Sequence, residues 1–304
     1  MVVDLLQNTL DGLMLGAAYA LLALGFTLIF GVLRRANLAY GPAIMIGAYA
    51  ATWVHLQFHA GFLVIALVTI AAAMAAGAYV EQLCFAPHAR RSRGAGDAGA
   101  VAAMVGSFAL WMQLEEAATL WLPKHLYSFP PLYDGPPIVL GPVTVRVEYL
   151  AMLACAVLAY LGLRQLLTRT RFGLAVRAVV DQADAARLAG INVPRIFMLV
   201  FAVASALGGL AGYLIVATHG QVTPMLGMWS TLKGMIAMML GGLGSLPGAV
   251  VGGLALGLIE SHSQWLFGPQ YRDLIAYLIL FALLAVQPSG LWAMLRRSPA
   301  PAAP

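Results

Sequence analysis

The chain has 304 residues, of which 62% are hydrophobic and 10% are charged. Soluble domains carry about 25% charged residues, so this composition excludes an ordinary soluble domain and indicates an integral membrane protein. The net charge of +5 does not indicate nucleic-acid binding, because the basic residues stand in short clusters between apolar runs, as cytoplasmic loops of membrane proteins do.

Apolar runs long enough to cross a membrane follow one another along the chain. A spanning helix needs about 20 mostly apolar residues. Such runs lie at about 8–30, 38–57, 62–85, 100–122, 148–168, 195–218 and 271–290. The region 226–268 is too long for one span, and GGLGSLPG at 241–248 divides it. We therefore predict an all-α polytopic membrane protein with about eight or nine membrane segments, some broken by Gly and Pro.

The chain is predicted to form one transmembrane domain over 1–290 and a short disordered cytoplasmic tail over 291–304. The loop 123–147 is rich in Pro and aromatic residues, as in LPKHLYSFPPLYDGPP, and is too polar to span. We expect it on the outer face, as a docking surface, a lid or a plain connector.

The basic residues set the expected orientation. Thirteen of the 17 lie on one predicted side: Arg34, Arg35, Arg90, Arg91, Arg93, Arg164, Arg169, Arg171, Arg177, Arg187, Arg195, Arg296 and Arg297. Lys124, Arg146, Lys233 and Arg272 remain outside or in the membrane. Basic loops stay in the cytoplasm, so the N-terminus is expected outside and the C-terminus inside.

A short charged segment near 173–194, GLAVRAVVDQADAARLAGINVPR, lies on the predicted cytoplasmic side. Ala, Leu and Arg favour helix. Arg177, Asp181, Asp184 and Arg187 are spaced by four, three and three, which predicts one charged stripe with i,i+3 and i,i+4 pairing. Gly190 is a natural helix end, and Pro194 prevents continuation. The segment is either a solvated connector or a docking element, and its length and small residues favour docking.

Several segments resemble a known family. RAVVDQADAARLAGINVPRI is similar to the coupling segment of ABC importer permeases, where an acid–Ala–Ala core, a glycine six residues after the acid and a hydrophobic–Pro ending recur. Here these positions are Asp184, Ala185, Ala186, Gly190, Val193 and Pro194. FAVASALGGLAGYL, MMLGGLGSLPGAVVGGLALGLIES and LGAAYALLALGFTLIFGVLRRANLAYGPAIMIGAYA resemble branched-chain amino acid permeases of the LivH type, and the resemblance covers about residues 8–290.

The resemblance implies a permease subunit of an ATP-driven importer that moves branched-chain or other hydrophobic amino acids inward across the bacterial inner membrane. It implies a second related permease in a heterodimer, two ATPase subunits and a periplasmic binding protein, without nucleic acid. ATP and magnesium would bind in the ATPase subunits. This chain lacks GxxxxGK[ST], the phosphate-binding loop of such ATPases, so we expect a non-catalytic subunit without a cofactor or metal of its own.

Polar residues in apolar runs are candidates for the transport pathway, because such groups are costly in lipid. The candidates are Asn37, Tyr40, Gly41, Glu115, Lys233 and Glu260. Asn37 could instead cap a half-helix, and Glu115 could reach the outer interface. Lys233 and Glu260 could meet substrate or form structural pairs. The resembling family usually has NFAHGE where this chain has NLAYGP, so Tyr40 and Pro42 depart from it.

Glycines at four-residue spacing predict close helix packing. They are Gly208 and Gly212, and Gly244, Gly248 and Gly252. These glycines could allow close packing between helices of this chain, or close contact with a paired permease.

Other functions remain open at this point. A permease for urea, short amides or aromatic carboxylates would share the same motifs. An ion-coupled secondary transporter needs carboxylates near the bilayer centre and often an inverted repeat, and neither is evident. An intramembrane enzyme would need a cluster of metal ligands or a nucleophile with its base. No His/Glu metal-ligand spacing and no mid-span Ser or Asp cluster indicates one.

Overall fold

The computed structural model describes residues 2–33, 35–87, 96–122, 126–133, 135–136, 138–140, 143–286 and 290–292. Its helices are α1 (Val2–Phe26), α2 (Tyr40–Phe58), α3 (Phe62–Val80), α5 (Gly96–Trp121), α6 (Val147–Arg169), α7 (Arg171–Asp181), α8 (Ala183–Leu188), α9 (Val193–His219), α10 (Met225–Gly241), α11 (Leu246–Phe267) and α12 (Arg272–Val286). π-Helical turns extend α1 (Thr27–Val32) and α3 (Glu81–Phe85), and a 3₁₀ turn (Pro269–Tyr271) precedes α12.

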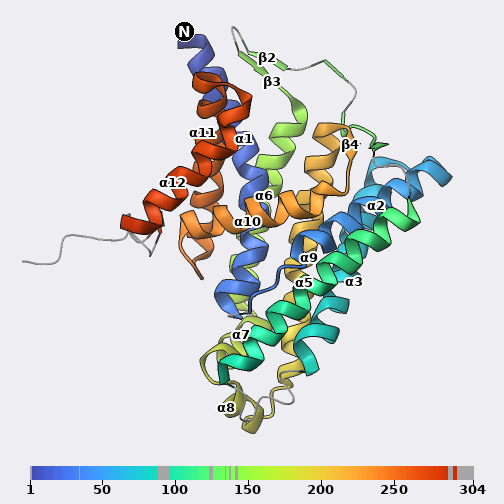
Figure 1. Cartoon of the computed structure of the whole chain (residues 1–304), viewed down its shortest axis with the longest axis vertical. Helices are drawn as coiled ribbons and strands as arrows, with labels where there is room; N and C mark the ends of the chain where they lie inside the picture. The colour runs from blue at the N-terminus through green and yellow to red at the C-terminus, as the bar shows by residue number, and fades with distance from the viewer. Residues whose placement is uncertain are drawn as a thin grey trace, which may run out of the picture.

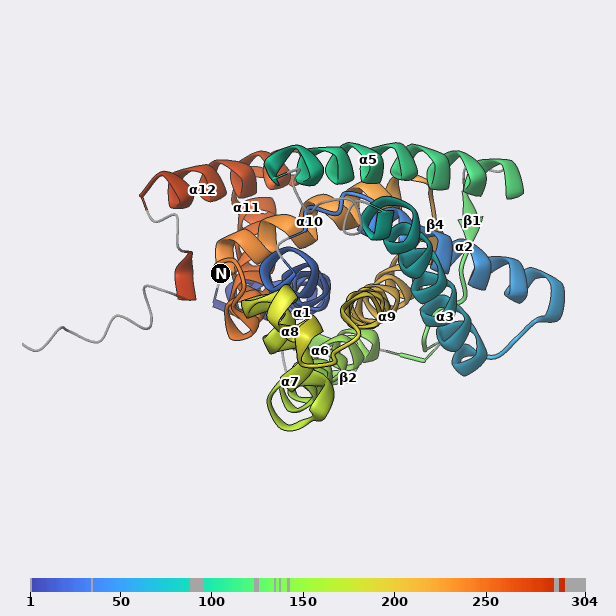
Figure 2. The ribbon, with the colours of Figure 1, turned by 90° about the horizontal axis from the view of Figure 1, so that it is seen from below.

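Helix α1 is the centre of the fold. Seen end-on, α1 and α9 lie inside the bundle, and α5 and α12 lie along one outer edge (Figure 2). The stretch Ala17–Leu24 is fully buried, and α11, α10, α9 and α6 all pack against α1. Outer helices instead expose large apolar side chains, among them Leu67 of α3 and Leu158 of α6. These side chains suit contact with lipid.

Glycines allow the closest helix contacts. A Cβ atom at Gly257 would lie 2.3 Å from the carbonyl oxygen of Gly12, so α11 touches the backbone of α1. At Gly212, a Cβ atom would lie 2.3 Å from Cγ2 of Ile44 on α2, and at Gly208, 2.8 Å from Cδ1 of the same side chain. The contacts of these glycines lie within the chain.

The predicted break in the region 226–268 is confirmed. Helices α10 and α11 meet at an angle of 116°, and α10 runs across the bundle in Figure 1. Gly242 (φ 104°) and Gly244 (φ 78°) adopt left-handed backbone, which glycine tolerates without steric cost. Oγ of Ser245 accepts a hydrogen bond from N of Gly248 at 3.1 Å and so caps α11.

The remaining predicted packing glycines lie at this break and beside it. A Cβ atom at Gly248 would lie 2.5 Å from the carbonyl oxygen of Gly241. At Gly252 it would lie 2.1 Å from the carbonyl oxygen of Ala237. Close backbone contact between α10 and α11 therefore continues beyond the turn.

Short strands add to the helical fold that the sequence predicts. β1 (Tyr127–Ser128) pairs antiparallel with β4 (Gln221–Val222), and β2 (Ile138–Leu140) pairs antiparallel with β3 (Val143–Val145). The side-chain amide of Gln7 holds β3 to α1, donating to O of Thr144 at 2.9 Å and accepting from its N at 3.0 Å. The strands β1 and β3 of the predicted outer loop thus contact the end of α9 and the start of α1.

The number of membrane segments stays a prediction. Among the described residues, four helical stretches are long and apolar enough to cross a membrane: Val3–Val32, Phe62–Phe85, Val147–Arg169 and Val193–His219. The bent pair α10–α11 could add a fifth. Helix α12 has 15 described residues, fewer than the roughly 20 that a span needs. These findings indicate a polytopic membrane protein without testing the count of eight or nine.

Some predicted features lie outside the described residues. They are the tail from residue 293 onward and the basic residues Arg34, Arg90, Arg91, Arg93, Lys124, Arg296 and Arg297.

Candidate functional site: a helix pair at one end and a charged cavity

The predicted charged helix is two helices. Helix α7 ends at Asp181 and α8 begins at Ala183, because Gln182 between them is extended (φ −151°, ψ 99°). The expectation of one continuous helix with a single charged stripe is therefore wrong. Asp184 and Arg187 pair at 3.0 Å within α8, whereas Nε of Arg177 donates to O of Gly173 at 3.4 Å.

Gly190 ends α8 in a complete Schellman motif. Its backbone is left-handed (φ 83°). N of Gly190 donates to O of Arg187 and N of Ile191 donates to O of Ala186, each at 3.0 Å. These are the two hydrogen bonds that define the motif. Pro194 then lies in the first turn of α9, where its missing N–H costs nothing.

The outer face of α8 exposes apolar side chains. Leu188 is 92% exposed, and Ala185, Ala189 and Gly190 are exposed beside it. Ala186 instead faces inward and packs with Val179 and Val193. Helices α7 and α8 lie at the end of the molecule opposite the N-terminus and the β2–β3 hairpin (Figure 1).

A partly buried arginine links this end to the long apolar helices. The guanidinium carbon of Arg35 lies 3.9 Å from the ring centre of Phe197 on α9 and 5.5 Å from that of Phe85. Nη1 of Arg35 also lies 3.6 Å from Oε1 of Glu81. Phe197 packs against the small core under α8. Arg35 and Phe197 therefore connect the small core under α8 with the ends of α1, α3 and α9.

The candidates at the start of α2 are buried. Oδ1 of Asn37 accepts from N of Ala39 at 3.0 Å, a local turn contact just before α2, whose N-cap Ala39 has no side-chain capping hydrogen bond. Oη of Tyr40 donates to O of Ala204 on α9 at 3.1 Å, and its ring meets Phe26 edge-on at 4.5 Å. At Gly41, a Cβ atom would lie 2.0 Å from O of Gly227.

Glu115 lies half-buried on α5, away from the other candidates. Its Oε2 accepts a hydrogen bond from Nε1 of Trp111 one turn earlier, at 2.8 Å. The structure gives it a local partner on its own helix.

Lys233 and Glu260 are brought together in a buried charge cluster. Lys233 is 1% exposed and Glu260 is fully buried, and Nζ of Lys233 donates to Oε1 of Glu260. Oε2 of Glu260 accepts from Nε of Arg272 and from Oη of Tyr19, each at 2.7 Å. Nζ of Lys233 also donates to Oδ1 of Asp273 at 2.5 Å. Two cations and two carboxylates balance, as burial requires.

Aromatic rings complete the surroundings of the Lys233 ammonium. Nζ lies 5.8 Å from the ring centre of Trp229 and 5.9 Å from those of Tyr19 and Tyr277, within the range of cation–π attraction.

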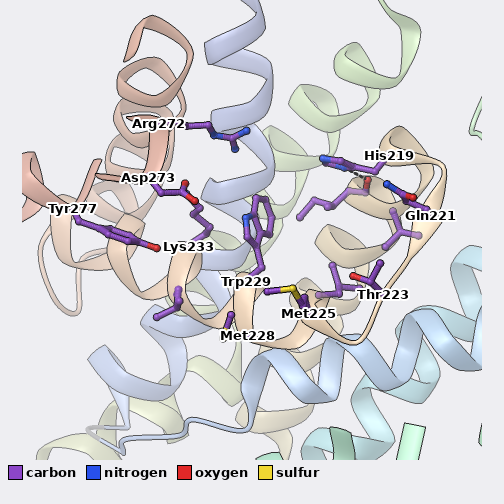
Figure 3. A pocket seen from close by; sticks show the side chains of 14 residues that line it. His219, Gln221, Thr223, Met225, Met228, Trp229, Lys233, Arg272, Asp273 and Tyr277 are labelled. Atoms are coloured by element: carbon purple, nitrogen blue, oxygen red, sulfur yellow. Dashed lines mark hydrogen bonds and ion pairs between the residues drawn. The ribbon is translucent and has the colours of Figure 1, made fainter. Parts of the chain in front are cut away.

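This cluster forms one wall of a cavity of about 370 Å³ between the end of α9, β4, α10 and α12. Figure 3 shows Lys233, Asp273 and Tyr277 on one side of Trp229 and His219 on the other. Ile215, Val216, Leu226 and Leu232 supply apolar lining. A second cavity, of 610 Å³, adjoins it and shares Ile215, His219 and Arg272.

Sequence reasoning missed Tyr19, Trp229, Arg272 and Asp273 as members of this cluster. They come from three helices, α1, α10 and α12, so spacing along the chain does not bring all of them together. One signal was available, because a lysine in an apolar run needs a carboxylate partner, and Asp273 opens the last apolar run.

Most of the chain matches a known transporter family. Residues 8–284 match the family described as branched-chain amino acid transport system, permease component. The chain belongs to this family.

Two relatives of this permease cover almost its full length. It is 29% identical over 298 residues to the high-affinity branched-chain amino acid transport system permease protein LivH of Escherichia coli K12, which covers 94% of each chain. It is 30% identical over 299 residues to the corresponding protein BraD of Pseudomonas aeruginosa, covering 94% of this chain and 95% of BraD. A fructose import permease, FrcC of Rhizobium meliloti, is 30% identical over 47% of this chain and 40% of its own. No solved structure matches the permease.

Proposed function

We propose that this chain is the transmembrane permease subunit of an ATP-driven importer that moves branched-chain or other hydrophobic amino acids inward. Family membership over residues 8–284 supports the transport role, and the names of LivH and BraD support the substrate class. The observation that carries the proposal is the α8 surface with exposed Leu188, closed by the Schellman motif at Gly190.

The α7–α8 pair is proposed to be the coupling element for the ATPase. A partner groove can accept a short helix closely where its face carries small residues, as at Ala185 and Ala189, and Leu188 can fill a pocket. Asp184 and Arg187 would fix the register through charge. Movement would then pass through Ala186 to α9 and through Phe197 to Arg35.

The assembly would contain a second related permease, two ATPase subunits that bind ATP and magnesium, and a periplasmic binding protein. We place α7 and α8 in the cytoplasm of a bacterium and the N-terminus outside the inner membrane. The basic residues of α6, α7 and α8 support this orientation, because the helix pair lies at the end opposite the N-terminus (Figure 1).

Copurification in mild detergent tests the proposal. The tagged chain should retain an ATPase and a second permease, and the double variant Asp184→Lys/Gly190→Asp should lose the ATPase while remaining in the membrane. A variant that keeps the ATPase at the native ratio would remove the coupling role from α8.

The ion-coupled alternative has one observation in its favour. The Lys233–Glu260 pair is buried and Lys233 also contacts half-exposed Asp273, and ionisable clusters inside membrane bundles serve ion coupling in secondary transporters. Uptake that follows an ion gradient without ATP would establish that alternative.

A further inference from the structure

The two carboxylates on Lys233 differ in how firmly they are held. Glu260 is fully buried and also binds Arg272 and Tyr19. The side chain of Asp273 is 53% exposed and contacts Nζ through Oδ1. Because a buried ammonium must keep a partner, Glu260 serves as the permanent one, and Asp273 can be exchanged at low cost.

The exchangeable contact faces the 370 Å³ cavity, which lies within the range of small-molecule sites, about 300–1,000 Å³. Asp273, Lys233, Arg272 and Tyr277 line one side of it (Figure 3). Nε of Arg272 donates to Glu260, and Trp229, Leu226 and Leu232 add apolar lining. The site therefore offers a cation, a movable anion and an apolar surface within one small space.

We propose that this cavity binds the transported amino acid as a zwitterion. The substrate carboxylate takes the place of Asp273 on Nζ of Lys233, the released Asp273 carboxylate binds the α-ammonium, and the apolar side chain lies against Trp229. This inference rests on the proposed function and names where in this chain the substrate binds.

Charge balance explains why a zwitterion fits and a simple ion does not. In the exchange each charge keeps a partner, so no uncompensated charge is buried. A carboxylic acid without an amino group leaves Asp273 unpaired beside a second anion. An amine without a carboxylate competes with Lys233 for Asp273 and leaves Lys233 with Glu260 as its one carboxylate partner. Asp273 is half-exposed, so each mismatch costs part of the penalty for a fully buried unpaired charge, and the site favours amino acids.

Equilibrium dialysis of the complete transporter in lipid nanodiscs, without the binding protein, tests this site. The probes are labelled L-leucine, 4-methylpentanoate, which lacks the amino group, and 3-methylbutylamine, which lacks the carboxylate. We expect the native transporter to bind leucine at least about tenfold more tightly than either analogue, as expected for one charged hydrogen bond. In Asp273→Asn, the preference for leucine over 4-methylpentanoate should disappear.

Two further variants separate recognition from folding. Met225→Trp extends a side chain that lines the cavity and is 62% exposed, so it should weaken leucine binding while the thermal midpoint stays near the native value. Glu116→Gln, exposed on α5, should leave both the affinity and the preference unchanged. An unchanged leucine preference in Asp273→Asn, or native transporter that binds no leucine, would overturn the proposal.

The same preparation distinguishes this inference from the proposed function. ATP-driven leucine uptake after reconstitution with the binding protein, together with an unchanged preference in Asp273→Asn, removes the cavity assignment alone. Failure of ATP-driven uptake by the native transporter removes both.

Discussion

At the scale of single residues, the two carboxylates that contact Lys233 are expected to contribute unequally to the free energy of unfolding. Glu260→Gln leaves Arg272 and Lys233 without the carboxylate that both of them contact. Removing one partner of a buried pair costs about 3 kcal/mol or more. Asp273→Asn affects a half-exposed pair, worth about 1 kcal/mol or less. Size-exclusion after heating should show a much lower thermal midpoint for Glu260→Gln than for Asp273→Asn. Equal midpoints would contradict this ranking.

Tyr40 joins α2 to α9 and α1 from within the core. Tyr40→Phe keeps the edge contact with Phe26 and loses the hydrogen bond to Ala204, for an expected cost of about 1 kcal/mol. Tyr40→Ala also leaves a cavity, and large aromatic truncations cost about 3–5 kcal/mol. We expect uptake kinetics to change in Tyr40→Ala with ATPase binding retained. Native stability and kinetics in Tyr40→Ala would exclude this linking role.

The sequence identified Tyr40, Lys233 and Glu260 as candidates but did not predict which residues they contact. Lys233 and Glu260 stand out because ionisable groups are rare in apolar runs, but the sequence left structural pairing and substrate contact open. The pairing depends on α1, α10, α11 and α12 meeting in space. The role of Tyr19 could not be predicted from the sequence, because a tyrosine in an apolar helix is common.

At the scale of elements, the end of α8 depends on the backbone of Gly190. Gly190 is exposed, and an added Cβ atom would meet nothing within 4 Å. Strain at its positive φ, rather than the burial of a charge, is therefore the reason to expect an effect. Gly190→Val should cost about 1–2 kcal/mol locally and reduce ATPase retention. Gly162→Ala in α6, where a Cβ atom also has open space, is the matched control and should retain the ATPase. Equal retention in both variants would count against the motif.

The contact between α11 and α1 has no room for side chains. A Cβ atom at Gly257 would approach Gly12 and Gly16 to 2.4 Å or less. Gly257→Leu must separate the two backbones, and overpacking costs about 1–3 kcal/mol or more. The folded yield in detergent should fall sharply, whereas Gly61→Ala, with open space around its Cβ position, should behave as native. A normal yield of Gly257→Leu would show that the two helices separate easily.

Local signals predicted element ends better than element continuity. GGLGSLPG indicated the break that Gly242 and Ser245 produce, because glycine and a capping serine act locally. The break at Gln182 was missed, since Gln is a good helix former and the bend reflects packing of Val179 and Ala186 under α8. The strands β1 and β4 were missed because their pairing joins segments far apart in the chain.

At the scale of the whole molecule, the arrangement links two distant features. Exposed α7 and α8 lie at one end (Figure 1), and the cavity beside Lys233 is lined by the end of α9, β4, α10 and α12. Helix α9 runs between them, from Val193 beside α8 to His219 at the cavity. Composition predicted the membrane class and helical fold. It could not predict this alignment, which depends on how the helices pack.

The central claim is that ATP hydrolysis in partner subunits drives amino acid import through this chain. The most direct measurement is uptake of labelled L-leucine by proteoliposomes containing the complete transporter, with ATP and magnesium inside and the binding protein outside. The account predicts accumulation with ATP, and none with a non-hydrolysable analogue or with a proton or sodium gradient alone. Accumulation driven by an ion gradient without ATP would contradict it.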